Sequence, residues 1–469
     1  MKKPKSFPAN PWGIMIYVLT IGLFTAIHAV IISAPTCSQT DVQSAINATK
    51  AGDTVALPPG SGTWGGVVSM DKGITLLGAG AGKTVINNAM AGSYTGQLVC
   101  DTGSFRRFSG ITFNGNAAAV TVYNLEVGGA GVFRIDHCAF TVPSGGTAVQ
   151  LWGGALTGVI DHNAFNAAGN AEIIHNSAYG PSDASGWSYD IVPGSGDAVY
   201  IEDDTFTNNA TGNPAYFWGC SAVQSYYGAR TVFRHNSVEM AQIDQHGTAG
   251  MIGARWWEIY ENTFSTTVPN ASQCCYITLR AGSGVVFNNH HTGANQVTGT
   301  IDLYEEDSGY PALYQIGRGK NQVSDPAYVW NNDASMSVGS QTPAMVQVNR
   351  DYYLSARPGY VPYIYPHPLT DGTSITGRMP GAPQRQDFFA VWNPLTSSIV
   401  LTFNNAYGNE RIMVSLFTFA GKKVLERPMN KQRENFLDGS GLSSGVYFVE
   451  VPGNGGNAVQ KVMVARRGK

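Results

Sequence analysis

The chain has 469 residues, of which 43% are hydrophobic and 13% are charged, so it is long and apolar enough for two or three folded domains and is not disordered. Its net charge of −3 is unevenly spread. Residues 406–469 carry ten Lys and Arg against five Asp and Glu, whereas residues 35–405 carry sixteen against twenty-seven. The acidic body argues against a nucleic-acid partner, because phosphate binding needs a basic face.

The N-terminus has the features of an export signal. Three lysines among the first five residues precede an apolar run over residues 13–34. The pattern predicts a signal peptide over residues 1–34 with cleavage near Ala34. Because the run is long, an uncleaved membrane anchor is the alternative. Export permits disulfides, but the spacing of the six cysteines leaves their pairing open.

Residues 37–52 are predicted to form a helix, in which Thr40 and Gln43 have the spacing of a capping box and an apolar stripe follows at helical spacing. Short apolar segments separated by Gly and Pro come next, and we interpret them as strands. A short helix ahead of such strands is typical of the capped end of a solenoid. Without a cap, the last strand would expose unpaired backbone groups.

A six-residue phrase then recurs along the chain. Its copies are Ile135-Asp-His-Cys-Ala-Phe140, Ile160-Asp-His-Asn-Ala-Phe165, Ile201-Glu-Asp-Asp-Thr-Phe206, Phe233-Arg-His-Asn-Ser-Val238 and Ile259-Tyr-Glu-Asn-Thr-Phe264. A repeated strand-and-turn unit cannot bury its apolar face alone, so the copies must stack. Strands this short, without helices between them, predict an all-β parallel β-helix. The Asn that usually fills the fourth position can bond the backbone of its own coil and of the next.

Residues 36–333 resemble the right-handed parallel β-helix proteins of the pectate-lyase-like superfamily. The resemblance rests on the N-terminal helix, the Gly52-Asp-Thr-Val opening, the Ile74-Thr-Leu-Leu-Gly-Ala-Gly strand and the Asn turns. It implies a right-handed β-helix domain, which we place at residues 35–368 and expect the tyrosine-rich stretch 345–368 to close. The resemblance specifies the fold well and the activity poorly, because one fold hosts many functions.

A Pro/Gly-rich linker is predicted over residues 369–386, and a small β-sandwich over residues 387–469. The C-terminal part resembles the type IX secretion sorting domain in Asn393-Pro394, Ala420-Gly-Lys-Lys-Val424 and Leu442-Ser-Ser-Gly-Val-Tyr-Phe-Val449. The resemblance implies a signal peptide at the inner membrane and type IX export across the outer membrane, followed by release or surface attachment. A carbohydrate-binding or adhesive sandwich is the alternative.

Strands of a β-helix stack about 4.8 Å apart, so outward residues at one register form a column. Each phrase is preceded by a further short strand, at residues 149–152, 172–175, 216–218, 243–246, 277–280 and 301–304. We place one residue of each strand inward, namely Leu151, Ile174, Phe217, Gln245, Leu279 and Leu303. The residues that follow them then form an outward column of Trp152, His175, Trp218, His246, Arg280 and Tyr304.

The residue types of this column suit a glycan, because aromatic rings stack on sugars while carboxylates and Arg bond hydroxyls or uronates. The inserts Tyr179–Gly196 and Ser225-Tyr-Tyr-Gly228 would wall the face. An exposed aromatic ladder that stabilises cross-strand stacking is the alternative. The hypothesis assigns catalysis to His246, Arg280, Tyr304 and His175, and substrate binding to Trp152, Trp218, Asp244, Asp302 and Glu306.

The roles follow from the chemistry of β-elimination. His246 can exchange protons near neutral pH, Arg280 can neutralise a uronate carboxylate, and Tyr304 can protonate the leaving oxygen. In lyases of the superfamily that the chain resembles, an Arg or Lys can itself be the base. Asp203-Asp204 resembles the paired aspartates of polygalacturonase-like hydrolases only in part, so hydrolysis ranks second.

A second column contains metal-ligand residue types, but its register comes from the repeat itself, so we favour a structural role for it. Its members are His137, His162, Asp203, His235 and Glu261. No sequence motif requires a cofactor. Ca²⁺ is the one ion that we consider, because the acidic body disfavours an anionic substrate unless a cation bridges the charges.

Taken together, these patterns predict a secreted, monomeric β-helix protein that acts on extracellular polysaccharide and is exported by the type IX secretion machinery. Lyase chemistry ranks ahead of glycoside hydrolysis. The rival class is a non-catalytic surface protein that binds glycans or mediates adhesion. The sequence lacks a Walker-type loop, a Gly-x-Ser-x-Gly elbow and Cys/His zinc spacing, so it offers no motif for those chemistries.

Overall fold

A computed structural model gives the fold. It describes residues 29–89, 96–99, 105–115, 118–123, 131–154, 156–209, 219–247, 251–266, 276–292, 299–306, 309–371, 388–393, 397–403, 411–418, 422–430, 434–453 and 456–464. Within these ranges, no helix is long and apolar enough to cross a membrane. The predicted signal peptide falls largely outside them.

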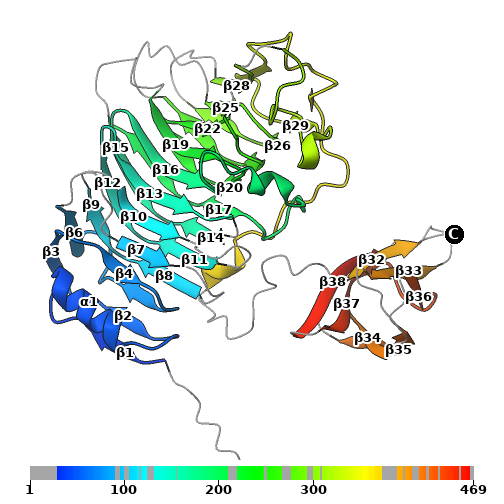
Figure 1. Ribbon diagram of the computed structural model, residues 1–469, viewed down its shortest axis with the longest axis horizontal. Coiled ribbons are helices and arrows are strands. Elements are labelled where there is room, and N and C mark those ends of the chain that lie inside the picture. Colours follow the sequence, from blue (N-terminus) through cyan, green and yellow to red (C-terminus); the bar gives the residue numbers. More distant parts are fainter. Residues whose placement is uncertain are drawn as a thin grey trace, which may run out of the picture.

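The described part of residues 29–371 forms a right-handed parallel β-helix with three parallel sheets, whose strands stack one coil upon the next (Figure 1). Sheet A contains, in spatial order, β1 (Ile31–Ser33), β2 (Thr54–Ala56), β5 (Thr75–Leu77), β8 (Phe105–Ser109), β11 (Gly131–Asp136), β14 (Leu156–Asp161), β17 (Val199–Glu202), β20 (Arg230–Arg234), β23 (Trp256–Tyr260), β26 (Ser283–Phe287), β29 (Ala327–Trp330) and β31 (Tyr352–Tyr353).

The other two sheets complete each coil, which runs from sheet A through sheet B to sheet C. Sheet B contains β3 (Gly60–Trp64), β6 (Thr84–Asn88), β9 (Thr112–Asn114), β12 (Ala139–Pro143), β15 (Ala164–Ala168), β18 (Thr205–Asn208), β21 (Ser237–Glu239), β24 (Thr263–Ser265) and β27 (His290–Thr292). Sheet C contains β4 (Val68–Met70), β7 (Gly96–Val99), β10 (Ala118–Tyr123), β13 (Thr147–Trp152), β16 (Ala171–Ser177), β19 (Cys220–Tyr226), β22 (Gln242–Gln245), β25 (Ile277–Leu279), β28 (Gly299–Leu303) and β30 (Met336–Gly339).

The turn from sheet A to sheet B contains the recurring phrase. The third phrase residue has a positive φ, as at His235 (55°), and the fourth is buried. The backbone N–H of Asn236 donates to Oδ1 of Asn262 on the next coil over 3.0 Å. Its Nδ2 donates to the carbonyl of Ile201 on the preceding coil over 2.9 Å. This asparagine ladder fixes the register of the coils, as the repeat predicts.

Helix α1 (Gln39–Ala48) covers the N-terminal coil and buries its apolar stripe. Its N-cap is Ser38, whose hydroxyl accepts a hydrogen bond from the Asp41 N–H over 3.2 Å. The predicted capping pair of Thr40 and Gln43 is therefore wrong by two residues. Gln43 instead bonds the backbone of β4 with its side-chain amide, and this contact ties the helix to the first coil.

Strand β1 comes from the stretch that the sequence assigns to the signal peptide. It pairs in parallel with β2, and the Val30 N–H donates to the Asp53 carboxylate over 2.9 Å. Cleavage at Ala34 would remove this outermost strand of sheet A. Retaining the strand requires a cleavage site before Val30.

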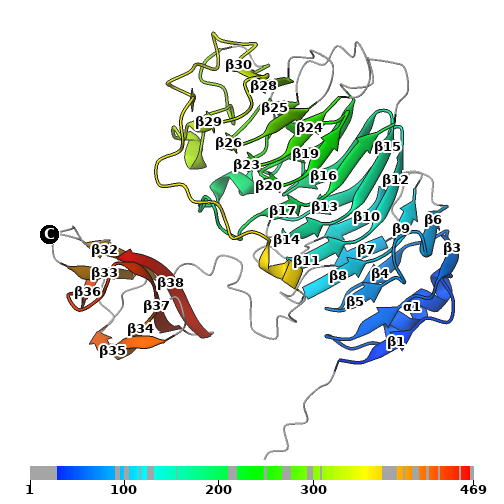
Figure 2. The same cartoon turned by 180° about the vertical axis from the view of Figure 1, so that it is seen from behind.

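Residues 357–371, called the strap below, cross the outer face of sheet A. The Tyr360 hydroxyl donates to Oε2 of Glu258 over 2.6 Å, and Arg234 donates to two strap carbonyls over 2.9 Å each. The strap ends in a short 3-10 helix, η4 (Pro368–Asp371), which lies beside β14 and β11 in both views (Figures 1 and 2). The tyrosine-rich stretch thus covers one sheet of the solenoid.

The C-terminal unit is a small sandwich of two antiparallel sheets with its own apolar core. One sheet contains β32 (Phe388–Asn393), β33 (Ser398–Phe403) and β36 (Glu434–Asp438). The other contains β35 (Lys423–Asn430), β34 (Arg411–Thr418), β37 (Gly445–Gly453) and β38 (Gly456–Val464). The fold class expected from the sequence, a capped β-helix followed by a β-sandwich, is confirmed.

Candidate functional site

The outer face of sheet C contains the centre of the predicted column. The last residues of β22, β25 and β28 pair in register and bury their side chains in the core. The next residues are His246, Arg280 and Tyr304, so they lie outward on three neighbouring coils. The ladder continues through them, because the N–H groups of Arg280 and Tyr304 each donate to the preceding coil over 2.9 Å.

His175 does not lie where the predicted column puts it. Strands β13 and β16 pair so that His175 lies beside Gln150, and not beside Trp152. The predicted alignment is wrong by two residues here, because the polar Asn176 takes the buried position next to Leu151. A shift of two keeps a side chain on the same face of the sheet, so His175 still points outward.

The third coil of the column has a sheet C strand that the sequence did not predict. The strand of that coil is β19, and residues 216–218, with the predicted sugar-binding Trp218, lie outside the described residues. Tyr226, at the end of β19, lies in line with Trp152 and next to His246. Tyr226 was not predicted as part of the column, because Ser225–Gly228 has the sequence of an inserted loop.

Four rings form a ladder across neighbouring coils of this face. Ring centroids are 5.5 Å apart between Trp152 and His175, 4.8 Å between His175 and Tyr226, and 4.6 Å between Tyr226 and His246. Both ring nitrogens of His175 have partners, Nδ1 with Glu172 at 2.7 Å and Nε2 with a serine hydroxyl at 2.8 Å. His175 is therefore held in place as part of an aromatic surface.

His246 is fixed at its backbone and neutral in its ring. Its N–H donates to the Ser225 carbonyl and its carbonyl accepts from the Ala254 N–H, each over 2.9 Å. Its Nδ1 is buried and has no hydrogen-bond partner among the described residues. Burial lowers the pKa of His246 below its usual value, although Asp244 acts in the opposite direction. The neutral imidazole that results at neutral pH is the form that can accept a proton.

Arg280 lies between two carboxylates. Its Nε donates to Oδ1 of Asp244 over 3.1 Å and its Nη2 to Oδ2 of the same group, while Nη1 donates to Oε1 of Glu306 over 3.3 Å. The side chains of Arg280 and Asp244 are 13% and 6% exposed, and that of Glu306 is 33% exposed. The guanidinium is thus held firmly by Asp244 and more loosely by Glu306.

The Tyr304 hydroxyl donates to the same Oε1 atom of Glu306 over 2.5 Å. Burial and this hydrogen bond raise the pKa of Tyr304 to about 12, so the phenol stays protonated at neutral pH. Asp302, predicted to bind substrate, instead accepts from the Gln341 side-chain amide over 2.6 Å and is 1% exposed. Asp302 therefore lies in the outward register of β28 but is covered there, and it is not open to a ligand.

The long loops from sheet C to sheet A pack on one another. Trp187, in the first predicted wall, is 3% exposed and its indole N–H donates to the Gly253 carbonyl over 2.9 Å. Its ring lies 4.9 Å from that of Tyr314, which belongs to a later loop. Trp187 therefore holds the loops together beside the end of sheet C.

The second predicted column lies at the turns with positive φ. His137 and His162 stack at 5.2 Å, and each bonds the buried aspartate that precedes it, over 2.7 and 2.9 Å. Asp204 is buried in the asparagine ladder, whereas Asp203 accepts from the Tyr365 hydroxyl over 2.7 Å. These two aspartates therefore have separate structural partners, unlike a catalytic pair.

Groups of three or more His, Cys, Asp or Glu that could hold a metal ion are absent from the described residues. Of the carboxylates beside the column, Asp244 and Glu306 both bond Arg280, and Glu172 bonds His175. Ca²⁺ takes six to eight oxygen ligands, and a guanidinium in their midst opposes such binding. The residues present do not fit a Ca²⁺ site at this position.

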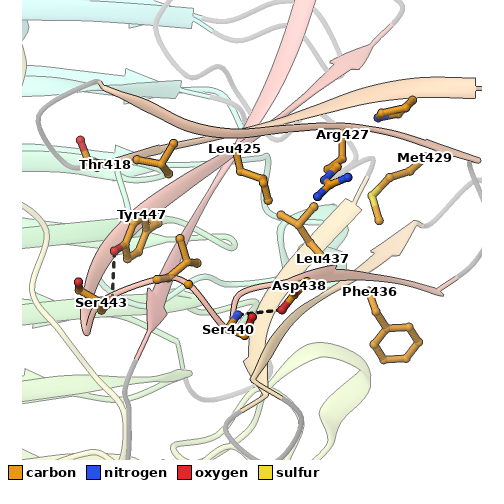
Figure 3. A pocket seen from close by; sticks show the side chains of 14 residues that line it. Thr418, Leu425, Arg427, Met429, Phe436, Leu437, Asp438, Ser440, Ser443 and Tyr447 are labelled. Carbon is orange, nitrogen blue, oxygen red and sulfur yellow. Dashed lines mark hydrogen bonds between the residues drawn. The ribbon is translucent and has the colours of Figure 1, made fainter.

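A cavity of about 770 Å³ lies in the C-terminal sandwich, between β35, β36 and the segment that leads to β37 (Figure 3). Its wall is mostly apolar, as at Leu425, Met429 and Leu437. Hydrogen bonds from Ser440 to Asp438 and from Tyr447 to the Ser443 carbonyl brace one side. Both of these hydrogen bonds lie within the turn itself, and Arg427 is the one basic side chain among the described residues of the wall.

Comparison with known proteins identifies the family of the C-terminal unit. Residues 392–465 match the secretion system C-terminal sorting domain family. The chain carries a type IX sorting domain. The protein is therefore handled by the type IX secretion machinery and exported to the cell surface or the extracellular space.

The β-helix has weaker likenesses. No curated protein matches the chain. Among solved structures it is similar to a variant of the PL6-family alginate lyase AlyGC, with 14% identity, coverage of 71% of this chain and 53% of that chain, and a TM-score of 0.29. The chain spans about half the length of that lyase. The fold assignment rests on the parallel sheets themselves, and the likeness adds nothing about activity.

Proposed function

We propose that this exported protein is a polysaccharide lyase that cleaves by β-elimination at uronate residues, with its site on the outer face of sheet C. The observation that carries the proposal is the row of His246, Arg280 and Tyr304 on neighbouring coils. It combines a neutral imidazole, a fixed guanidinium and a protonated phenol. Elimination requires a base, a cation near the developing charge and an acid.

In this mechanism His246 removes the proton from C5 of the uronate. The electron pair of that bond forms the double bond between C4 and C5 as the bond from C4 to the glycosidic oxygen breaks. Tyr304 gives its proton to the leaving oxygen, and Arg280 stabilises the charge that develops on the carboxylate. The aromatic ladder of Trp152 and its neighbours supports adjacent sugars, and we assign His175 to this surface.

The test is an assay of the exported protein on polyuronates and neutral glycans. Elimination yields an unsaturated uronate with a new ultraviolet absorbance. We expect His246→Ala and Tyr304→Phe each to lower turnover by about 10²–10⁴-fold. The matched control is His162→Asn, which removes an imidazole from the turn column and should leave turnover unchanged. Full activity in both His246→Ala and Tyr304→Phe would contradict the mechanism.

A second candidate is a non-catalytic glycan-binding protein, which the four-ring ladder favours. Stacked rings bind sugars without any chemistry. Glycan binding without new absorbance or new reducing ends would support this candidate. New reducing ends without the absorbance would indicate hydrolysis.

A further inference from the structure

One oxygen atom of Glu306 joins the cation and the acid of the proposed site. Oε1 accepts from Arg280 Nη1 over 3.3 Å and from the Tyr304 hydroxyl over 2.5 Å. Glu306 comes three residues after the end of β28, and its side chain is 33% exposed. A carboxylate oxygen of the protein thus lies where the proposed chemistry requires a group of the substrate.

The two carboxylates at Arg280 are not equivalent. Asp244 binds Nε and Nη2 together in the two-pronged geometry that Arg favours, and it is 6% exposed. Of the Arg280 donors, Glu306 accepts from Nη1 over a longer contact of 3.3 Å, and its side chain reaches solvent. Asp244 is therefore the lasting partner, and Glu306 is the partner that another carboxylate can replace.

We propose that Glu306 occupies the place of the uronate carboxylate in the free protein and moves aside when substrate binds. This inference rests on the proposed lyase function. An incoming carboxylate has the same charge and hydrogen-bonding shape as Glu306, so it can take over Arg280 Nη1. When Glu306 leaves, Tyr304 loses its acceptor, and its hydroxyl becomes free to turn to the leaving oxygen.

This occupancy has two consequences for specificity. A neutral sugar offers no carboxylate to replace Glu306, so it leaves the cation and the acid paired with each other. Two carboxylates beside one guanidinium give the free cluster a net negative charge that opposes an anionic ligand. Glu306 therefore selects for uronates and at the same time weakens their binding.

The test measures the binding of galacturonate, glucuronate and mannuronate oligomers by calorimetry. It uses the full exported chain in a His246→Ala background that prevents turnover. We expect Glu306→Gln and Glu306→Ala to bind the preferred oligomer about tenfold more tightly, equal to about 1.4 kcal/mol. The methyl ester of that oligomer lacks the carboxylate and should bind equally to all variants. Thermal unfolding verifies that each variant is folded.

The matched control is Asp302→Asn, which removes a neighbouring carboxylate held by Gln341 and leaves the Arg280 contacts in place. Asp302→Asn should change the affinity for the oligomer by less than about twofold, because the contact between Arg280 and Glu306 stays intact. If Asp302→Asn tightened binding equally, the effect would come from the net charge of the site and not from Glu306 occupying the carboxylate position. Unchanged or weaker binding in both Glu306 variants would also overturn the inference.

The outcome is separable from that of the proposed function. In one outcome, the wild-type protein forms no unsaturated product while the Glu306 variants still bind about tenfold more tightly. This result would contradict the elimination mechanism and support the occupied carboxylate site. If the wild-type protein is a lyase and Glu306→Gln leaves KM unchanged, the occupancy falls and the lyase function stands.

Discussion

The outer faces of sheet A and sheet C both carry an arginine paired with a carboxylate, but only one pair is sealed. On sheet A, Arg234 and Glu202 are each 0% exposed, and the strap covers them. On sheet C, Arg280 and Glu306 remain partly exposed, although Asp244 is nearly buried. The same residue types therefore serve the fold on one face and remain available for chemistry on the other.

The difference lies in what takes up the remaining donors of each arginine. Arg234 donates to the carbonyls of Tyr363 and Ile364, which belong to the strap backbone, so they cannot leave unless the strap detaches. Arg280 donates instead to the Glu306 side chain, which can rotate away. A backbone partner makes a permanent contact, and a side-chain partner makes an exchangeable one.

The largest effect should separate the two arginines. Arg234→Ala leaves Glu202 buried without its cation, and we expect the free energy of unfolding to fall by about 3–5 kcal/mol. Arg280→Ala should cost less stability, because Arg280 itself and its partner Glu306 are partly exposed, but it should abolish turnover. Urea denaturation and the elimination assay measure the two effects. Equal loss of stability in the two variants would contradict the distinction between a sealed pair on sheet A and a partly exposed pair on sheet C.

Asp204 extends the comparison to a buried carboxyl that lacks a cation. Its Oδ1 accepts from Asn163, but its buried Oδ2 has no hydrogen-bond partner among the described residues. Burial raises its pKa well above the usual value. An Asn at this position could donate to the preceding coil, as Asn236 does. We expect Asp204→Asn to stabilise the protein by about 1–3 kcal/mol at neutral pH.

The stabilisation by Asp204→Asn should depend on pH. Below the unfolded pKa of about 3.9, Asp204 is protonated in both states and the wild-type protein has its full stability. As pH rises toward the folded pKa, folding must take up a proton, so stability falls. The advantage of Asp204→Asn should therefore grow from about pH 4 upward. Asn236→Asp is the matched reverse change, and an opposite trend in either variant would contradict the account.

The pH profile of turnover sharpens the assignment on sheet C. His246 must be neutral to accept a proton, and burial lowers its pKa below the usual value of about 6.5. Activity should therefore reach its plateau below neutral pH and fall about tenfold per pH unit further into acid. Measuring kcat/KM against pH tests this expectation. An acid limb well above pH 6.5 would contradict a buried, neutral His246.

The smallest effect compares two tyrosines that each donate to a glutamate. Tyr360 bonds Glu258 under the strap over 2.6 Å, and Tyr304 bonds Glu306 on sheet C over 2.5 Å. Tyr360→Phe should lower stability by about 1 kcal/mol and leave turnover unchanged. Tyr304→Phe should leave stability nearly unchanged and lower turnover. Thermal unfolding and the elimination assay would reveal an exchange of these roles.

Much of the fold follows from local rules in the sequence. The recurring phrase predicts the parallel coils because a positive-φ residue followed by Asn, as at His235 and Asn236, recurs on several coils. The sequence signal weakens where polar residues point inward. Asn176 and Ser225 are buried, and they displaced the predicted alignment of His175 and hid the strand that ends in Tyr226.

The candidate site could be predicted only as a row of residue types. His246, Arg280 and Tyr304 come directly after their strands, so their alignment needs only the coil register. The strap could not be located in this way, because the contact of Arg134 with Leu369 joins residues 235 positions apart. The sharing of Glu306 Oε1 by two donors likewise depends on side-chain geometry that no repeat encodes.

The most direct test of the lyase site is a crystal structure of the full-length His246→Ala protein with a bound oligouronate. We expect a sugar across β22, β25 and β28, with its carboxylate on Arg280 Nη1, Glu306 turned away and the Tyr304 hydroxyl facing the glycosidic oxygen. A sugar bound on another face, or one on sheet C with Glu306 still bonded to Arg280, would contradict this expectation.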